Sequence, residues 1–166
     1  MNVTVKKVNS LTVKNVKELF KPIGGNHINI FQKKDWDILY IENRPFIDED
    51  TYPFFFNFFS KIKENEINII PYPTNLEGSY LVIKTTSNFD DFDDLMNQYY
   101  FRFVGGVSYG ESKDWALYSE PDNHILFFGF HNKYIDIVKE IFKKNIFIVD
   151  KIRLIEYYDY KEGDNT

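Results

Sequence analysis

The chain has 166 residues, of which 43% are hydrophobic and 19% aromatic, and its formal net charge is −5. This length is typical of one domain, and so much apolar surface favours a folded core over disorder. The absence of cysteine excludes disulfides and thiolate metal sites, and the negative charge disfavours nucleic acid, which binds basic faces.

The first 42 residues predict one helix among three strands. The helix has Ser10 or Thr12 as its N-cap, and Gly24 is placed to end it. The strands are expected at residues 3–8, 27–32 and 35–42.

The next segment predicts an aromatic helix. Thr51 is a suitable N-cap, and Pro53 lies in the first turn, where its missing N–H costs nothing. Phe55, Phe58, Phe59 and Ile62 then recur at helical spacing and form an apolar stripe. Further strands are expected at residues 66–72 and 78–85, followed by an amphipathic helix over residues 88–103.

The C-terminal third predicts a hairpin, a helix and a closing strand or bent strand pair. The hairpin joins residues 114–119 to 124–130 through a turn containing Pro121. The helix runs over 132–145 with Asn132 as its cap, and residues 146–160 follow it as strand. The main core is predicted to contain Trp115, Leu117, Ile125, Phe127, Ile137, Val138 and Ile141.

Helices that alternate with hairpins predict an α+β fold. We expect a single domain over residues 1–166, with the tail 161–166 frayed. The sheet is expected to be antiparallel or mixed, with three to four helices packed on it. The sequence leaves open whether these helices cover one face of the sheet or both.

Residues 105–112, "GGVSYGES", contain the pattern G-x-S-x-G of a hydrolase nucleophile elbow. That elbow needs a strand before the serine and a helix after it. Here a helix is expected before Ser108 and a strand after it, so we interpret the segment as a loop in which Ser108 is not a nucleophile. We predict no catalytic residue and no cofactor. We also predict no metal site, because His27, His124 and His131 lack ligand spacing.

The helix expected over residues 88–103 is strongly acidic on one side. Phe92, Met96 and Tyr99 fall on its apolar side, opposite four aspartates. Acids in a first turn complement the helix dipole, but Asp90 and Asp94 are an i, i+4 pair that repels. The aspartates beyond the one or two that the helix dipole explains suggest a surface for a basic partner, although a plain solvated face remains an alternative. Residues 89–122 carry eight acids and two bases, and the candidate partner-binding residues are Asp91, Asp94, Gln98, Glu111, Asp114, Glu120 and Asp122.

The hairpin "DWALYSEPDNHILFFGF" behind an acidic aromatic helix resembles the strand pairs of small bacterial immunity proteins from polymorphic-toxin systems. The resemblance covers residues 88–145 at most and rests on Trp115-x-x-Tyr118 followed by Phe127-Phe128-Gly129. It implies a cytosolic inhibitor that neutralises a toxin domain, such as a basic nuclease. Acidic inhibitors of this kind are steered onto basic sites by their charge.

Two other functions remain open on the sequence. The aromatic run over residues 54–59 could line the pocket of a ligand-sensing regulatory module, and Ser108 with a histidine could serve a small hydrolase. Residues 1–15 contain no apolar run of signal-peptide length, and no stretch approaches the ~20 apolar residues of a membrane span. We therefore expect a cytoplasmic monomer or weak homodimer that makes no contact with a membrane.

Overall fold

The computed structural model describes residues 3–22, 30–42, 51–71, 80–85, 94, 98, 106–120, 125–142 and 147–148. The strands are β1 (Val3–Lys7), β2 (Trp36–Glu42), β3 (Glu66–Pro71), β4 (Tyr80–Thr85), β5 (Gly106–Gly110), β6 (Trp115–Glu120), β7 (Ile125–His131) and β8 (Phe147–Ile148). The helices are α1 (Ser10–Leu19), α2 (Tyr52–Ile62) and α5 (Ile135–Ile141), the last preceded by the 3₁₀ turn η2 (Asn132–Tyr134). None of these helices is long and apolar enough to cross a membrane.

The strands form one sheet in the order β1-β4-β3-β5-β6-β7-β2-β8. Every pairing within it is antiparallel. The predicted α+β class is therefore confirmed, and the sheet is antiparallel rather than mixed. The hairpin of β6 and β7 lies where the sequence predicted it, with Trp115 opposite Phe130.

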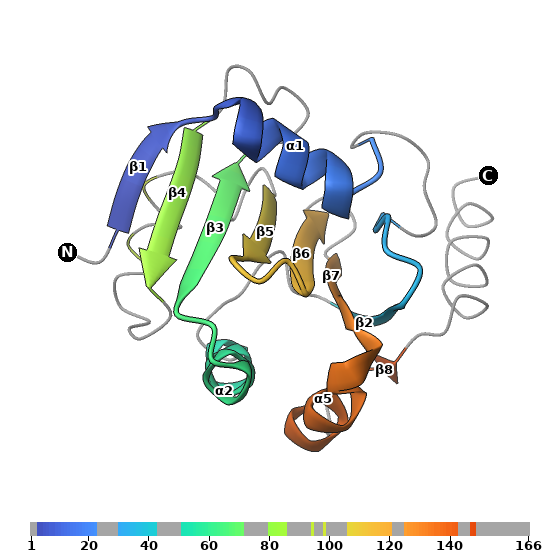
Figure 1. The fold of residues 1–166 in the computed structure, drawn as a ribbon. Helices are drawn as coiled ribbons and strands as arrows, with labels where there is room; N and C mark the ends of the chain where they lie inside the picture. The colour runs from blue at the N-terminus through green and yellow to red at the C-terminus, as the bar shows by residue number, and fades with distance from the viewer. Residues whose placement is uncertain are drawn as a thin grey trace, which may run out of the picture.

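Helices cover both faces of the sheet. Helix α1 packs on one face, while α2 and α5 pack on the other (Figure 1). Strand β7 shows why both faces are covered, because its apolar residues run without a break. Leu126 and Phe128 join the cluster under α2 and α5, whereas Phe127 joins the cluster under α1.

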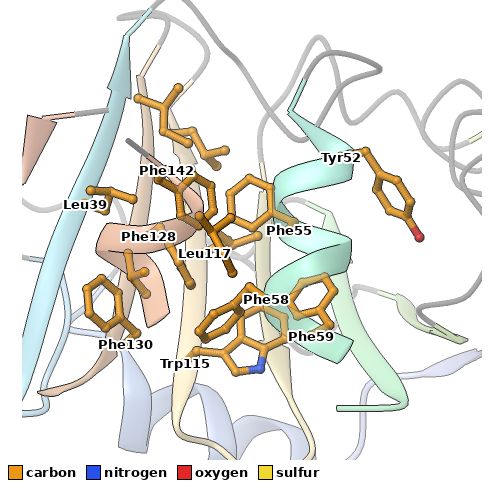
Figure 2. Close-up of a cluster of buried hydrophobic side chains, with 14 of the residues drawn as sticks. Leu39, Tyr52, Phe55, Phe58, Phe59, Trp115, Leu117, Phe128, Phe130 and Phe142 are labelled. Atoms are coloured by element: carbon orange, nitrogen blue, oxygen red, sulfur yellow. The ribbon is translucent and has the colours of Figure 1, made fainter. Parts of the chain in front are cut away.

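The cluster under α2 and α5 is built largely from aromatic rings (Figure 2). Phe55 and Phe58 meet Phe128 edge-on, with ring centroids 5.3 and 5.1 Å apart. Phe59 lies against Trp115 with centroids 4.6 Å apart. Aromatic pairs at such separations add stabilisation beyond the area they bury, so the predicted phenylalanine stripe of α2 is confirmed as core.

Most of the predicted core residues are confirmed, but one of them lies on the other face of the sheet. Trp115, Leu117, Val138 and Ile141 lie in the cluster under α2 and α5, and Ile137 is partly buried against it. Phe127 is buried but lies on the α1 side, so placing it in the same core was wrong. The prediction placed the apolar residues of the hairpin and of the following helix in one core, but Phe127 faces the opposite side of the sheet from Leu117 and Phe128. The side chain of Ile125 is outside the described residues.

The helix ends differ in detail from those predicted. Asn9, rather than Ser10 or Thr12, caps α1 by accepting a hydrogen bond from the Thr12 backbone N–H, and the helix ends at Leu19 instead of near Gly24. His131, rather than Asn132, caps η2 through its ring Nδ1. Within the predicted strand 27–32, the described part makes one isolated bridge, from Phe31 to Phe20.

The end of α2 forms a Schellman motif. Thr51 precedes the helix as predicted. At the other end, Lys63 adopts φ 61°, its N–H donates to the Ser60 carbonyl, and the Glu64 N–H donates to the Phe59 carbonyl. Glycine is the usual residue at such a left-handed position. This motif turns the chain so that Glu64 folds back beneath the helix.

Candidate functional site

The G-x-S-x-G segment is a central strand of the sheet, so its interpretation as a loop was wrong. Residues 106–110 form β5, which pairs with β3 on one side and β6 on the other. All five residues are buried. The error arose because glycine is common in turns. The glycines of this segment were therefore interpreted as a loop, although Val107 and Tyr109 between them are apolar.

Alternation along β5 turns Gly106, Ser108 and Gly110 toward α2, opposite the β6 residues Leu117 and Ser119. The phenylalanines of α2 share one cluster with side chains of β3 and β6, the two neighbours of β5. Ser108 is buried on this side of the sheet, paired with Ile69 of β3 and with Leu117 of β6.

Gly110 makes room for a buried carboxylate. A Cβ at Gly110 would overlap the Glu64 carboxylate and the Trp115 indole nitrogen. Glu64 is only 7% exposed. Its Oε2 accepts hydrogen bonds from Trp115 Nε1 at 3.0 Å and from the Ser112 hydroxyl at 2.6 Å. Charge-assisted bonds of this kind are about twice as strong as neutral ones, so they fasten the β5–β6 turn (residues 110–115) to the end of α2.

Ser108 lacks the environment of an activated serine. Its hydroxyl is buried and has no hydrogen-bond partner in the described part of the chain, and the same holds for Ser119. The nucleophilic serine of a G-x-S-x-G elbow sits at a turn between a strand and a helix, within reach of a base. Ser108 instead lies at the middle of a strand.

The same turn is tied to α1 on the opposite face. Lys113, at φ 57°, reaches Glu18 of α1 with its Nζ 3.2 Å from Oε2. Lys33 contacts the other oxygen of Glu18 at 3.0 Å. The hydrogen bonds from Lys33 and Lys113 hold the pKa of the Glu18 carboxyl below its usual value. Two ammonium groups thus surround one carboxylate, and the trio keeps a net positive charge.

Asp114 connects the turn to the start of α5. Its Oδ2 lies 2.6 Å from Lys133 Nζ and accepts a hydrogen bond from the Tyr134 hydroxyl at 3.2 Å. The hydrogen bond to Asp114 raises the pKa of Lys133. Burial, followed by the Asp114 charge, raises the pKa of Tyr134. Asp114 is thus a paired residue that fixes the turn, and its charge is partly compensated.

The predicted partner-binding residues divide into three groups. Asp94 and Gln98 are helical and exposed, as expected of the outer face of the acidic helix. Glu111 is exposed in the β5–β6 turn, in the same turn as half-buried Asp114. Asp91, Asp122 and the side chain of Glu120 are outside the described residues.

Sequence reasoning missed the residues that hold the turn in place. Glu64, Lys113 and Lys133 each contact a group from another layer of the molecule. Glu64 and Trp115 are 51 positions apart, and nothing local in the sequence pairs them. The one usable signal was Gly110, because a glycine inside a strand often marks a close approach by another group.

Among the described residues, no group of three or more histidine or acidic side chains is placed to hold a metal ion. Comparisons with family models, curated proteins and solved structures found no match for this chain.

Proposed function

We propose that this chain is a cytosolic protein-binding inhibitor of the immunity or antitoxin kind, which neutralises a toxin domain through an acidic surface. The observation that carries the proposal is the exposure of Asp94 and Gln98, two helical residues of the acidic segment over residues 89–122. The resemblance of residues 88–145 to immunity proteins adds support. The partner is expected to be basic, because charge complementarity is what steers such pairs together.

The β5–β6 turn supports the same role through its rigidity. Contacts to Glu64, to Glu18 and to Lys133 fix it from three directions. A preorganised loop loses little conformational freedom on binding, which improves affinity. Glu111 is exposed in this turn and supplies an exposed charge, while Asp114 serves to hold the turn.

The experiment is co-expression with the product of the adjacent gene, which is the candidate toxin. The wild-type chain is expected to restore growth. The variant Asp94→Lys/Glu111→Lys is expected to lose protection, because it reverses two exposed charges of the proposed surface. The control Glu66→Lys/Asp136→Lys makes the same charge change at exposed positions on β3 and α5 and is expected to protect like the wild type.

Equal protection by the two variants would refute the acidic surface as the binding site. Absence of growth inhibition by the adjacent gene product, or of protection by the wild-type chain, would refute the assigned partner. Circular dichroism of both variants checks that each is folded.

A further inference from the structure

Within the described part of the chain, strand β1 is paired on one side only. It pairs with β4 in a register that places Val5 opposite Val82, and it is the terminal strand in the sheet order. Figure 1 shows it in dark blue at the end of the sheet. Four of its five residues are exposed. An edge strand of this kind offers a row of backbone N–H and C=O groups to which another strand can pair.

The side chains of β1 decide which strand that edge can accept. Val5 is 41% exposed, and Lys6 and Lys7 follow it, also exposed. In an antiparallel pairing of two copies about Val5, Lys6 would face Thr4 and Lys7 would face Val3, so all four lysines would lack a carboxylate opposite them. A strand with carboxylates at those positions gains opposite-charge cross-strand pairs, so the lysines favour such a strand over a second copy. They favour a strand that brings carboxylates opposite Lys6 and Lys7 and an apolar residue opposite Val5.

The residues that surround β1 in the sequence are also positively charged. Residues 1–34 contain seven lysines and a single acid, Glu18. That acid is already paired with Lys33 and Lys113. Lys14 and Lys17 of α1 are exposed. The N-terminal part of the chain is therefore cationic within a protein whose net charge is −5.

We propose that the outer edge of β1 is a docking site for an extended acidic segment of a partner protein, which adds to the sheet as a further antiparallel strand. Backbone hydrogen bonds would supply the pairing, and the two lysines would select an acidic sequence. This site lies on a different element from Asp94, and it takes a partner segment of the opposite charge to the one proposed for the acidic surface.

The probe is a labelled peptide containing Glu-Glu-Val-Thr-Val, whose residues face Lys7, Lys6, Val5, Thr4 and Val3 in an antiparallel pairing. Fluorescence anisotropy at low salt is expected to detect its binding to the full chain. A peptide with Lys-Lys in place of Glu-Glu is expected to bind about tenfold more weakly or not at all, since two cross-strand pairs become repulsive.

Two N-methylated forms of the acidic peptide test for strand addition. N-methylation of the amides along one edge of the peptide removes the donors to β1 and is expected to abolish binding, whereas methylation along the other edge is tolerated. The protein variant Lys6→Glu/Lys7→Glu is expected to lose the acidic peptide and gain the lysine peptide. The control Lys61→Glu/Lys139→Glu, altered at exposed positions on α2 and α5, is expected to bind like the wild type.

Absence of binding by the acidic peptide would overturn the proposal. Binding that neither N-methylated form weakens would also overturn it, because the contact would then be electrostatic without strand pairing. Equal weakening by the two protein variants would show that net charge, not the β1 edge, governs binding.

Discussion

Replacement of Glu64 with alanine tests the attachment of the β5–β6 turn to α2. The change removes the acceptor for the buried Trp115 indole N–H and for the Ser112 hydroxyl. An orphaned buried donor costs about 1–3 kcal/mol, and the lost bond to a charged acceptor falls in a similar range. Because Ser112 is exposed, water can replace its bond, so most of the loss comes from Trp115. We expect the free energy of unfolding to fall by about 2–4 kcal/mol.

Urea denaturation followed by Trp fluorescence measures this loss directly. Ser112→Ala is the matched control, because it removes the Ser112 bond to Glu64 and the long 3.3 Å bond from the Asp114 N–H, both of which water can replace. It is expected to cost less than about 1 kcal/mol. Glu64→Gln keeps an acceptor oxygen and is expected to fall between the two. A loss below about 1 kcal/mol for Glu64→Ala would refute the reasoning that this carboxylate fastens the turn.

Three further changes test other parts of the account by thermal or urea unfolding. Ser108→Ala removes a buried hydroxyl without a partner in the described chain, so stability should stay equal or rise by up to about 1 kcal/mol; a clear loss would mean that the hydroxyl is bonded. Lys63→Gly removes the backbone strain of a non-glycine residue in the left-handed conformation at the end of α2. It should stabilise the protein by about 1 kcal/mol, whereas destabilisation would contradict the Schellman geometry. Phe127→Ala empties a site that is 3% exposed on the α1 face and should cost about 3–5 kcal/mol; a loss below about 1 kcal/mol would place Phe127 at the surface.

The elements with strong periodic patterns were predictable from the sequence. The Thr51–Pro53 start and the phenylalanine stripe located α2, and the alternating residues on either side of Pro121 located the β6–β7 hairpin. The coverage of both faces of the sheet was not predicted, although strand β7 carries a signal of it. The unbroken run Leu126–Phe130 has no polar side to turn toward solvent, which is typical of a strand buried on both faces.

The structure of β5 and of the turn after it could not be predicted from local patterns. Gly110 looks like a turn residue until Glu64 is known to lie against it. The contacts of Lys113 with Glu18 and of Lys133 with Asp114 join residues that are far apart in sequence. Such contacts depend on how the layers pack, and a single sequence does not record that. The exposure of Asp94 and Gln98 was predictable, because the apolar side of the helix expected over residues 88–103 is predicted to face inward.

The central claim is that exposed acids guide a basic partner to this protein. The most direct test measures the association rate of the chain with the purified adjacent gene product across a range of salt concentrations. We predict that the wild-type rate falls steeply as salt rises, and that Asp94→Lys/Glu111→Lys associates at least about tenfold more slowly at low salt, with little difference at high salt. An association rate that is independent of salt, and equal in the wild type and the variant, would contradict the claim.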